Sequence, residues 1–543
     1  MDEGTVLRHL KRSYGHIRTA AKAAVLALVV AGTAGAGPYR AIVPAAGENA
    51  DPIALTGHDL TVEQLVAIAR HGQKVVVTPE AADHQDETHG LLLEAAAEGV
   101  PVPGFNRAAN ESGAVLFDGD PTVAETAAML RRKALAAFEG NAASGPEIAD
   151  EETVRAMMVV RANTLTYTPA STPVTEMLLR FLNDRITPAV SAGDPLGGIA
   201  AAMVGRGDAY YHGIRMPAAQ ALSQAGLMPL TPVDDDYDAL TQTEAYITGR
   251  TALLVADGRR MLEWSDLIFA MDLNGMNAGI APLSVPAQEN RPLKWTYWDA
   301  RRVLDMVKGG YLLSEDNPAA RPYPPSLDLS ITRQGAAWRT WGNLRDVLLV
   351  ALNSSDQALV IRPGLSQRES RELGSPRMLK YYVRGGRAND GKRGFVIPAL
   401  NRDPAALAAE IEAFAGAVGM LNGALGQRAA VPPPPVQPAA EDGLVPVARA
   451  HQLLETAFGL LAADLGAAAR LMDQRQAENP ARSFGAAPTA AWSAFRMAAP
   501  PSAGSDAARR FMDDNQPAAF YPKGEPPLGS DDAIPLAQEK MDR

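Results

Sequence analysis

One stretch of the sequence carries residues that could hold a metal ion. The segment ADHQDETHG contains His84, Asp86, Glu87 and His89 within six residues. Histidine ligands on one helix usually stand four residues apart, so that both rings reach the same ion. His84 and His89 are five residues apart and would diverge on a helix, so the pattern favours a solvated helix start over a metal site.

A second stretch has the composition of an anion-binding loop. The segment VRGGRANDGKRG, residues 383 to 394, combines glycines with four basic side chains. It lacks the Lys-Ser/Thr ending of a phosphate-binding loop, which favours a basic surface turn. Trp295, Tyr297 and Trp298 could line an aromatic pocket, but large aromatic side chains mostly fill cores. No Ser-His-Asp order and no dinucleotide fingerprint occurs in the chain.

The composition argues against several classes of function. The chain has 543 residues, of which 47% are hydrophobic, enough for a large buried core. A net charge of -11 and a pI near 5.4, without a long basic run, argue against nucleic acid as a partner. Cysteine is absent, which excludes disulfides, thiolate metal sites, iron-sulfur clusters and a cysteine nucleophile.

The N-terminal segment predicts export. Basic residues precede the apolar run AAVLALVVAGTAGA, residues 23 to 36, which ends in the small residues that signal peptidase prefers. The run is shorter than the ~20 residues of a membrane span, so no stable span is predicted. We expect a periplasmic or secreted protein, with an ordinary N-terminal helix in a cytoplasmic protein as the alternative.

Helical periodicity dominates the rest of the chain. Thr61 and Gln64 match a capping box, and a short strand is expected from Lys74 to Thr78. Two apolar stripes with steps of four and three predict long helices packed into a bundle. These stripes consist of Leu407, Ile411, Phe414, Val418, Leu421 and Leu425, then of Leu454, Phe458, Leu461, Leu465, Ala468 and Met472. The predicted fold class is all-α, with a small mixed segment near the N-terminus.

Proline-rich and glycine-rich stretches divide the chain into segments. The polar stretch after Pro500 lacks periodicity and predicts a flexible tail. The predicted segments are a signal peptide at 1 to 36, a linker at 37 to 56, a helical core at 57 to 430, a proline-rich linker at 431 to 443, further core helices at 444 to 499 and the tail at 500 to 543.

Five stretches follow one another in an order that resembles a known family. They are PVPGFNRAAN (101 to 110), RANTL (161 to 165), DPLGGIAAAMVGRGDAYYHGIRMPAAQALSQAGLMPLTP (194 to 232), YPPSLDLSITRQGAAW (323 to 338) and LNSSDQAL (352 to 359). They are similar to motifs of the aromatic amino acid lyases, the histidine and phenylalanine ammonia-lyase family. The resemblance extends from about Leu55 to Gln476.

The resemblance implies a long-helix bundle of the ammonia-lyase/aspartase-like superfamily. It also implies homotetramers whose active sites are built from several subunits. The electrophile of the family is a 4-methylideneimidazol-5-one ring, made from an internal Ala-Ser-Gly, and a tyrosine removes the β proton of the substrate. Such chemistry is needed because an amine leaves poorly and a β C–H is a weak acid.

The stretch AVSAGDPLGGIA, residues 189 to 200, occupies the place of that electrophile. In one register the triad falls on residues 189 to 191, and in another it falls on Ser191, Ala192 and Gly193, followed by Asp194. The central residue is Val190 or Ala192, and neither has a hydroxyl to lose as water. The ring is therefore not expected, and no other cofactor or metal is expected either.

Other positions implied by the resemblance have also changed. Pro103 stands where the family has its tyrosine, and Asp328 stands where an arginine would hold the substrate carboxylate. A carboxylate at that place would repel the substrate instead of binding it. The candidate pocket consists of Pro103, Phe105, Asn106, Thr241, Asp328, Asn353 and Ser355. The candidate catalytic set is Ser191, Ala192, Gly193, Asp194 and Asp356.

The sequence therefore predicts a divergent homo-oligomer, tetrameric by resemblance. It would be non-catalytic or repurposed, with a small-molecule ligand. The first alternative is an active aromatic amino acid ammonia-lyase or aminomutase, which would require Ser191 to take part in cyclisation. A further alternative is acid-base chemistry from Asp194, Asp328 and Asp356.

Overall fold

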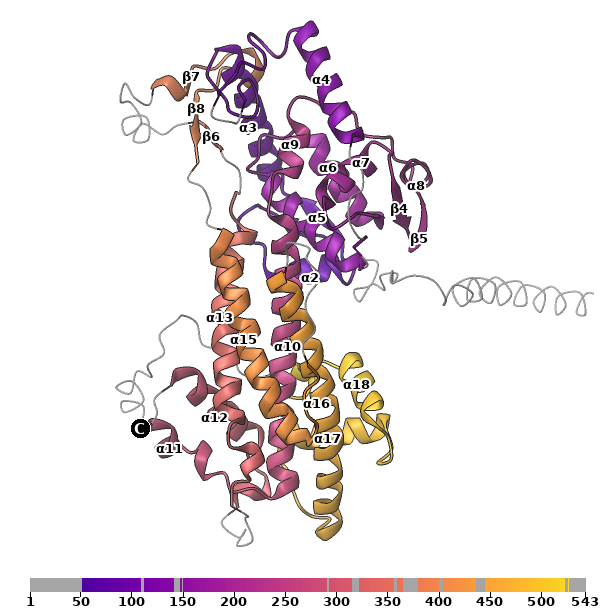
Figure 1. Cartoon of the computed structure of the whole chain (residues 1–543), viewed down its shortest axis with the longest axis vertical. Coiled ribbons are helices and arrows are strands. Elements are labelled where there is room, and N and C mark those ends of the chain that lie inside the picture. Colours follow the sequence, from indigo (N-terminus) through magenta and orange to yellow (C-terminus); the bar gives the residue numbers. More distant parts are fainter. Residues whose placement is uncertain are drawn as a thin grey trace, which may run out of the picture.

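The computed structural model describes residues 51 to 526 with internal gaps. The gaps are 109–111, 141–146, 149, 291–292, 315–321, 356–358, 365–378, 400–403, 436–444 and 523–525. Figure 1 shows an upper unit of mixed helices and strands above a lower bundle of long helices. The segments predicted as a signal peptide and most of both linkers lie outside the described residues.

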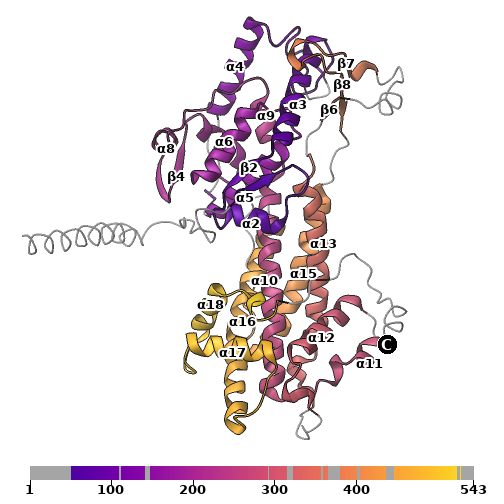
Figure 2. The same ribbon diagram turned by 180° about the vertical axis from the view of Figure 1, so that it is seen from behind.

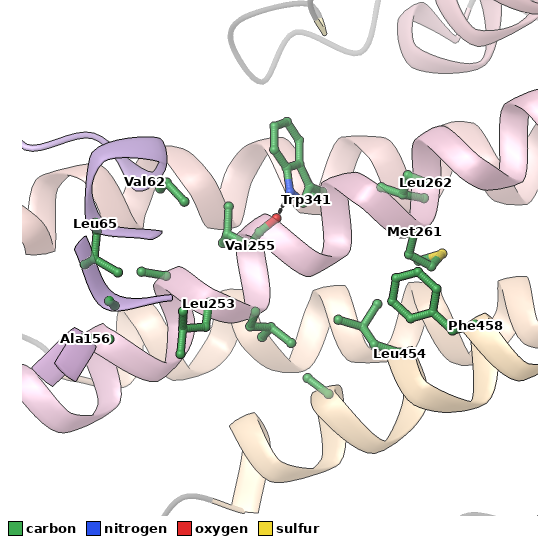
Figure 3. Packing of buried hydrophobic residues seen from close by; sticks show 14 of the residues in the cluster. Val62, Leu65, Ala156, Leu253, Val255, Met261, Leu262, Trp341, Leu454 and Phe458 are labelled. Carbon is green, nitrogen blue, oxygen red and sulfur yellow. Dashed lines mark hydrogen bonds between the residues drawn. The ribbon is translucent and has the colours of Figure 1, made fainter. Parts of the chain in front are cut away.

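Four long helices form the bundle, as the apolar stripes predict. They are α10 (Ala245–Met276), α13 (Ser330–Leu352), α15 (Pro404–Ala429) and α16 (Val445–Glu478). The members of both stripes are buried, from Leu407 to Leu425 in α15 and from Leu454 to Met472 in α16. Figure 3 shows Leu454 and Phe458 of α16 facing Met261 of α10. The prediction of a helical bundle is therefore confirmed.

Glycine allows close approaches between the bundle helices and the aromatic side chains packed against them. A β carbon on Gly258 of α10 would lie 2.7 Å from the ring of Phe414 in α15. A β carbon on Gly342 of α13 would lie 2.8 Å from the ring of Trp295. Both distances are shorter than van der Waals contact, so the aromatic rings use the space that glycine leaves.

The upper unit begins with the elements that the sequence predicts. Strand β1 (Ile53–Leu55) pairs in parallel with β2 (Val75–Val77), and helix α2 (Val62–Ala69) connects them. Thr61 and Gln64 form the expected capping box. The side chains of Val62, Leu65 and Ile68 are buried against the top of the bundle. Helix α3 (Pro79–Ala97) follows with Thr78 as its N-cap, so it begins at Pro79 instead of near His84.

The upper unit also contains a small antiparallel sheet and six further helices, several of which pack against the sheet. The sheet consists of β3 (Ile186–Pro188), β4 (Asp208–Tyr211) and β5 (Ile214–Pro217). The helices are α4 (Ala124–Glu139), α5 (Glu151–Leu165), α6 (Thr172–Asn183), α7 (Pro195–Met203), α8 (Ala218–Gln224) and α9 (Asp236–Thr241). Helix α5 is buried along nearly its whole length and packs against α10 of the bundle.

A second sheet lies at the top of the molecule, within a region that the periodicity predicts to be mostly helical. Strands β6 (Leu359–Pro363) and β7 (Tyr382–Val383) both pair antiparallel with β8 (Gly394–Pro398). With helix α3 they enclose a small core of their own, which contains Leu91, Phe105 and Val396. These strands are short, so they leave only a weak period of two in the sequence.

Shorter helices cover the lower bundle. They are α11 (Val285–Glu289), α12 (Lys294–Met306), α17 (Ala486–Ala498) and α18 (Ser505–Asp514), with a 3-10 turn, η6 (Pro517–Ala519), after α18. Figure 2 shows α17 and α18 beside α16. The prediction of a flexible tail from residue 500 is wrong for α18, because Ala508, Phe511 and Met512 are buried.

One described helix is apolar and long enough to cross a membrane by length and composition. It is Ala405–Ala429 in α15, and 44% of its most apolar window is buried within the chain. Helix α15 packs between α13 and α16, which accounts for the buried part of its apolar surface.

Candidate functional site

The stretch predicted to occupy the place of the electrophile, residues 189 to 194, is a turn between strand β3 and helix α7. The Ala189 amide donates to the Asp208 carbonyl at 3.0 Å, and the Ile148 amide donates to the Val190 carbonyl at 2.9 Å. Asp194 caps α7, because its carboxylate accepts from the Gly197 amide at 3.0 Å. The turn is therefore fixed at both ends by hydrogen bonds.

The two candidate central residues of the triad differ in their surroundings. Val190 is buried, and a β carbon on Gly198 would lie 2.8 Å from its γ1 methyl group. Ser191 is also buried, Ala192 is half-buried and Gly193 is exposed. The side chain of Val190 therefore packs in the core, while residues 192 to 194 lie closer to the surface.

Helix α9 brings further titratable groups toward this turn. Burial raises the pKa of Tyr237, and the nearby charges of Asp194 and Asp238 raise it further. Burial and the neighbouring Asp238 also raise the pKa of Asp235 well above its ordinary value. The phenol and the carboxyl groups could together hold or move a proton.

Thr241 is close to this group but its hydroxyl is engaged in the helix. It donates to the Tyr237 carbonyl at 2.8 Å, one turn back in α9. Tyr237 was not predicted from the sequence, although it stands four residues before Thr241 and so on the same face of the helix. That spacing was the signal that could have found it.

The loop that contains Pro103 is a separate structural feature. Asn106 is buried, accepts from the Val102 amide at 2.8 Å and donates to the Val100 carbonyl at 2.9 Å. Phe105 packs edge-on against Phe117, with ring centroids 5.2 Å apart. Phe105 and Asn106 therefore hold the loop, and only Pro103 of the predicted residues is exposed there.

Asn353 joins the end of α13 to the start of α2. Its side chain accepts from the Leu60 amide at 2.8 Å and donates to the Leu60 carbonyl at 2.9 Å. Asn163 of α5 donates to the same side-chain oxygen at 3.3 Å and accepts from the Gly57 amide at 3.0 Å. The two asparagines form a clamp between the upper unit and the bundle. Ser355 is half-buried beside this clamp, and Asp356 lies outside the described residues.

Replacing Asn353 by alanine is expected to lower the free energy of unfolding by about 1–3 kcal/mol, because buried backbone groups of Leu60 would lose their partner. Urea unfolding followed by circular dichroism measures this. The exposed Asn290, changed to alanine, is the control and should remain within about 0.5 kcal/mol of the parent. Equal stability of both variants would contradict the role of the clamp.

Asp328 lies far from the other predicted pocket residues within one chain. It is exposed and directly follows the 3-10 turn η3 (Pro325–Leu327), before α13 begins. The 23 residues of α13 separate Asp328 from Asn353 by about 33 Å at about 1.5 Å per residue. A single chain therefore brings Asp194 near Tyr237 and Thr241 but leaves Asp328 at the opposite end of α13.

The other motifs have structural roles. No group of three or more histidine and acidic residues that could hold a metal is present among the described residues. The amides of Arg384 and Gly385 donate to Glu98 at 2.8 and 3.0 Å, so an internal carboxylate occupies the glycine-rich loop. The ring centroids of Trp295 and Trp298 are 6.2 Å apart. Trp295 is buried in the core and Trp298 packs against it, as the core-packing interpretation predicts.

Comparison with known proteins supports a relationship to lyases over most of the chain. Histidine ammonia-lyase 2 of Fusobacterium nucleatum is 25% identical over 323 residues, which cover 58% of this chain and 62% of that protein. The histidine ammonia-lyase of Geobacillus thermodenitrificans is 28% identical over 324 residues, which cover 58% of this chain and 63% of that protein. The matched part thus spans less than two thirds of these relatives.

Solved structures of two enzymes share the fold. Tyrosine aminomutase from Streptomyces globisporus matches with a TM-score of 0.68 and 18% identity, covering 88% of this chain and all of that one. An ergothioneine-degrading enzyme from Treponema denticola matches with a TM-score of 0.65 and 20% identity, covering 86% of this chain and 99% of that one. The family model for aromatic amino acid lyases matches residues 60–487. The chain therefore belongs to the aromatic amino acid lyase family.

Proposed function

We propose that this chain is a member of the family that does not form the methylideneimidazolone ring and has kept the scaffold for another role. The observation that carries the proposal is the composition of the turn between β3 and α7. Its central residue is Val190 or Ala192, and neither has the hydroxyl that ring formation removes. The residues present therefore do not fit the prosthetic group.

The packing around the turn supports the same proposal. Val190 is buried against Gly198, and its carbonyl already accepts from the Ile148 amide. The side chain of Asp194 is engaged as the cap of α7. In this role the turn contributes to stability, and the half-buried Tyr237 beside it would form one wall of a small-molecule pocket.

The proposed assembly is a homo-oligomer, a tetramer by analogy with the family. An exposed apolar stripe on α15 supports it, formed by Ala409, Ala413, Gly416 and Met420 at steps of four and three. Met420 is 55% exposed, and Val350 on the neighbouring helix α13 is 64% exposed. Apolar surface of this kind is typically covered by another subunit. A second copy could also bring Asp328 toward a neighbour's turn.

The alternative function is ammonia elimination or amino-group migration on an aromatic amino acid. The match of the family model to residues 60–487 is the observation that favours it. It would need an electrophile made from Ser191 and its neighbours, and a base other than Pro103.

We expect the intact mass of the purified protein to equal that of the encoded chain, or of a chain that starts near Gly37, as a removed signal peptide would leave. Ring formation would lower the mass by two water molecules. The histidine ammonia-lyase of Geobacillus thermodenitrificans, produced in the same bacterial host, is the positive control.

The same preparations are then tested for enzymatic activity. Formation of cinnamate, coumarate or urocanate is followed by ultraviolet absorbance with phenylalanine, tyrosine or histidine as substrate. We expect no product from this chain and clear product from the control with histidine. A mass deficit of two waters, or catalysed formation of any of the three acids, would overturn the proposal and establish the alternative.

A further inference from the structure

A cavity in the bundle lies outside the residues discussed above. Its volume is about 890 Å³, within the range of small-molecule sites. Helices α2, α10 and α13 form its walls, Gln516 and Ala518 at the 3-10 turn η6 line one side, and the cavity is open to solvent. The lining residues on which the argument depends are Val66, Arg259, Arg260, Trp341, Arg345 and Gln516.

The floor of the cavity is apolar and held in place. Trp341 of α13 donates its indole N–H to the Val255 carbonyl of α10 at 2.8 Å, as Figure 3 shows. This bond fixes the orientation of the indole ring. Val62 and Val66 of α2 also line the cavity, as does Leu349 of α13. Because Trp341 and Val62 are buried, the apolar surface open to a ligand is that of Val66 and Leu349.

The polar part of the lining is rich in arginine. Three guanidinium groups, those of Arg259, Arg260 and Arg345, share the lining with two carboxylates, those of Glu63 and Glu263. Both carboxylates lie next to Arg259, with the closest N–O distances at 3.7 and 3.1 Å. The lining therefore carries more cationic than anionic groups, and its excess charge belongs to Arg260 and Arg345.

The carboxylates that approach Arg260 and Arg345 lie outside the lining. Asp513 lies 3.5 Å from Arg260, and Asp346 lies 3.1 Å from Arg345. Both carboxylate side chains are about half exposed, so water screens these two pairs. The Arg260 guanidinium also donates to the Met512 carbonyl. A guanidinium group has five N–H donors, so these partners still leave some of them for a ligand.

The two arginines are positioned for an anion. The Arg345 guanidinium lies 5.2 Å from the centroid of the Trp341 ring, so that charge and apolar surface are adjacent. Arg260 is packed over Phe458 at 5.4 Å. Its Nε is buried and has no hydrogen-bond partner among the described residues. The Arg260 side chain is 20% exposed, so a ligand can reach part of it.

The closing wall comes from beyond the family match. Gln516 and Ala518 line the cavity, whereas the family model ends at residue 487. Pro517 is buried, and Phe520 is stacked on Phe511 with centroids 6.1 Å apart. These contacts hold the segment against the bundle beside the cavity.

We propose that this cavity binds an organic anion with a flat apolar body, such as an aromatic carboxylate. The apolar body would lie against Val66 and Leu349, and the carboxylate would accept from Arg345 and Arg260. The site is separate from the turn at residues 189 to 194, so it does not depend on the proposed function.

The test uses the purified full chain and 2-naphthoate as the probe, with isothermal titration calorimetry. We expect a dissociation constant in the micromolar to low millimolar range. The uncharged 2-naphthamide should bind at least about 10-fold more weakly, because charge-assisted bonds to arginine are lost. Failure of naphthoate to bind at millimolar concentration, or equal binding of the amide, would overturn the proposal.

Two variants locate the binding site. Arg345→Gln and Arg260→Gln should each weaken naphthoate binding by at least about 10-fold. Arg301→Gln, which removes an exposed charge from α12, is the matched control and should bind like the parent. The melting temperature of each variant shows that it is folded. Unchanged affinity in both folded cavity variants would overturn the assignment, whatever the intact mass shows about the ring.

Discussion

Replacing Arg428 by methionine is expected to lower the free energy of unfolding by about 3–5 kcal/mol. Arg428 is buried in the centre of the bundle and forms ion pairs with Asp464 at 2.7 Å and Asp272 at 3.1 Å. Its side chain also donates to the Ser265 carbonyl at 3.3 Å. Methionine keeps the apolar stem but leaves two buried carboxyl groups without their cation.

The control for this experiment is an arginine at the surface. Arg449 pairs with Glu412 at 3.1 Å, and both side chains are about half exposed. Arg449→Met should cost no more than about 1 kcal/mol, because water and salt screen the exposed pair. Denaturant unfolding of both variants measures the difference. A loss below about 1 kcal/mol in Arg428→Met would contradict a structural role for the buried ion pairs.

A triple variant separates loss of charge balance from loss of packing. Combining Arg428→Met with Asp272→Asn and Asp464→Asn removes the uncompensated carboxylates as well as the cation. We expect it to recover at least half of the stability lost in Arg428→Met, since the penalty comes chiefly from unpaired buried charge. A triple variant that is less stable than Arg428→Met would show that lost packing costs more than the unpaired charge.

The helices were predictable because their signals are local. The capping box at Thr61 lies within four residues, and the stripe from Leu407 to Leu425 lies on one helix. The contacts of Arg428 were not predictable, because its partners Asp272 and Asp464 come from α10 and α16, far apart in the sequence. The periodicity of one helix does not say which charged side chain is buried against another helix.

The candidate site was predictable only in part for the same reason. Asp194 precedes a proline and glycines, a local pattern that predicts the helix cap observed. The resemblance places Asn106 and Asn353 in the pocket, and within one chain both are hydrogen-bonded to backbone groups. Helix α18 was missed because only three of its residues, Ala508, Phe511 and Met512, are buried, within a stretch rich in polar and small residues.

A second buried group of charges predicts how stability depends on pH. Asp266 and Asp299 lie side by side in the bundle with Arg302, which pairs with Asp266 at 3.1 Å. Gln334 and Trp338 donate to Asp266 at 2.8 and 3.1 Å. Burial raises the pKa of Asp266 to about 6. Burial, and then the charge of Asp266, raises the pKa of Asp299 well above its ordinary value.

The direction of the pH dependence follows from these two raised pKa values. Between the ordinary pKa of 3.8 and about 6, Asp266 binds more protons in the folded state than in the unfolded state. Asp299 extends this pH range to higher values, because its pKa is also raised in the folded state. The stabilisation is therefore fully present at low pH and is lost as the pH rises through the folded pKa values. A shift of this size for Asp266 corresponds to roughly 3 kcal/mol.

Other titratable groups lie near Asp266 and Asp299, and they could also contribute to the pH dependence of stability. The Arg428 guanidinium donates to the Gln334 side-chain oxygen at 3.5 Å. Through Arg428, Gln334 is connected to the two carboxylates of Asp272 and Asp464. Burial raises the pKa of both of these carboxyl groups. On the other side, Arg302 lies 5.1 Å from the ring of Tyr521. Burial and a bond to Asp305 raise the pKa of Tyr521 to about 12, above the range of the experiment.

Replacing Asp299 by asparagine is therefore expected to stabilise the protein by about 1–3 kcal/mol at pH 8 and by less at pH 5. An asparagine amide can donate to Asp266, as a protonated Asp299 would, without requiring a proton from solvent. Urea unfolding at intervals from pH 5 to pH 9 should show a shallower fall in stability with rising pH than in the parent. Asp83→Asn at an exposed position is the control and should keep the slope of the parent. The same slope in Asp299→Asn as in the parent would mean that Asp299 does not hold the proton, and the dependence would then have to come from Asp272 and Asp464.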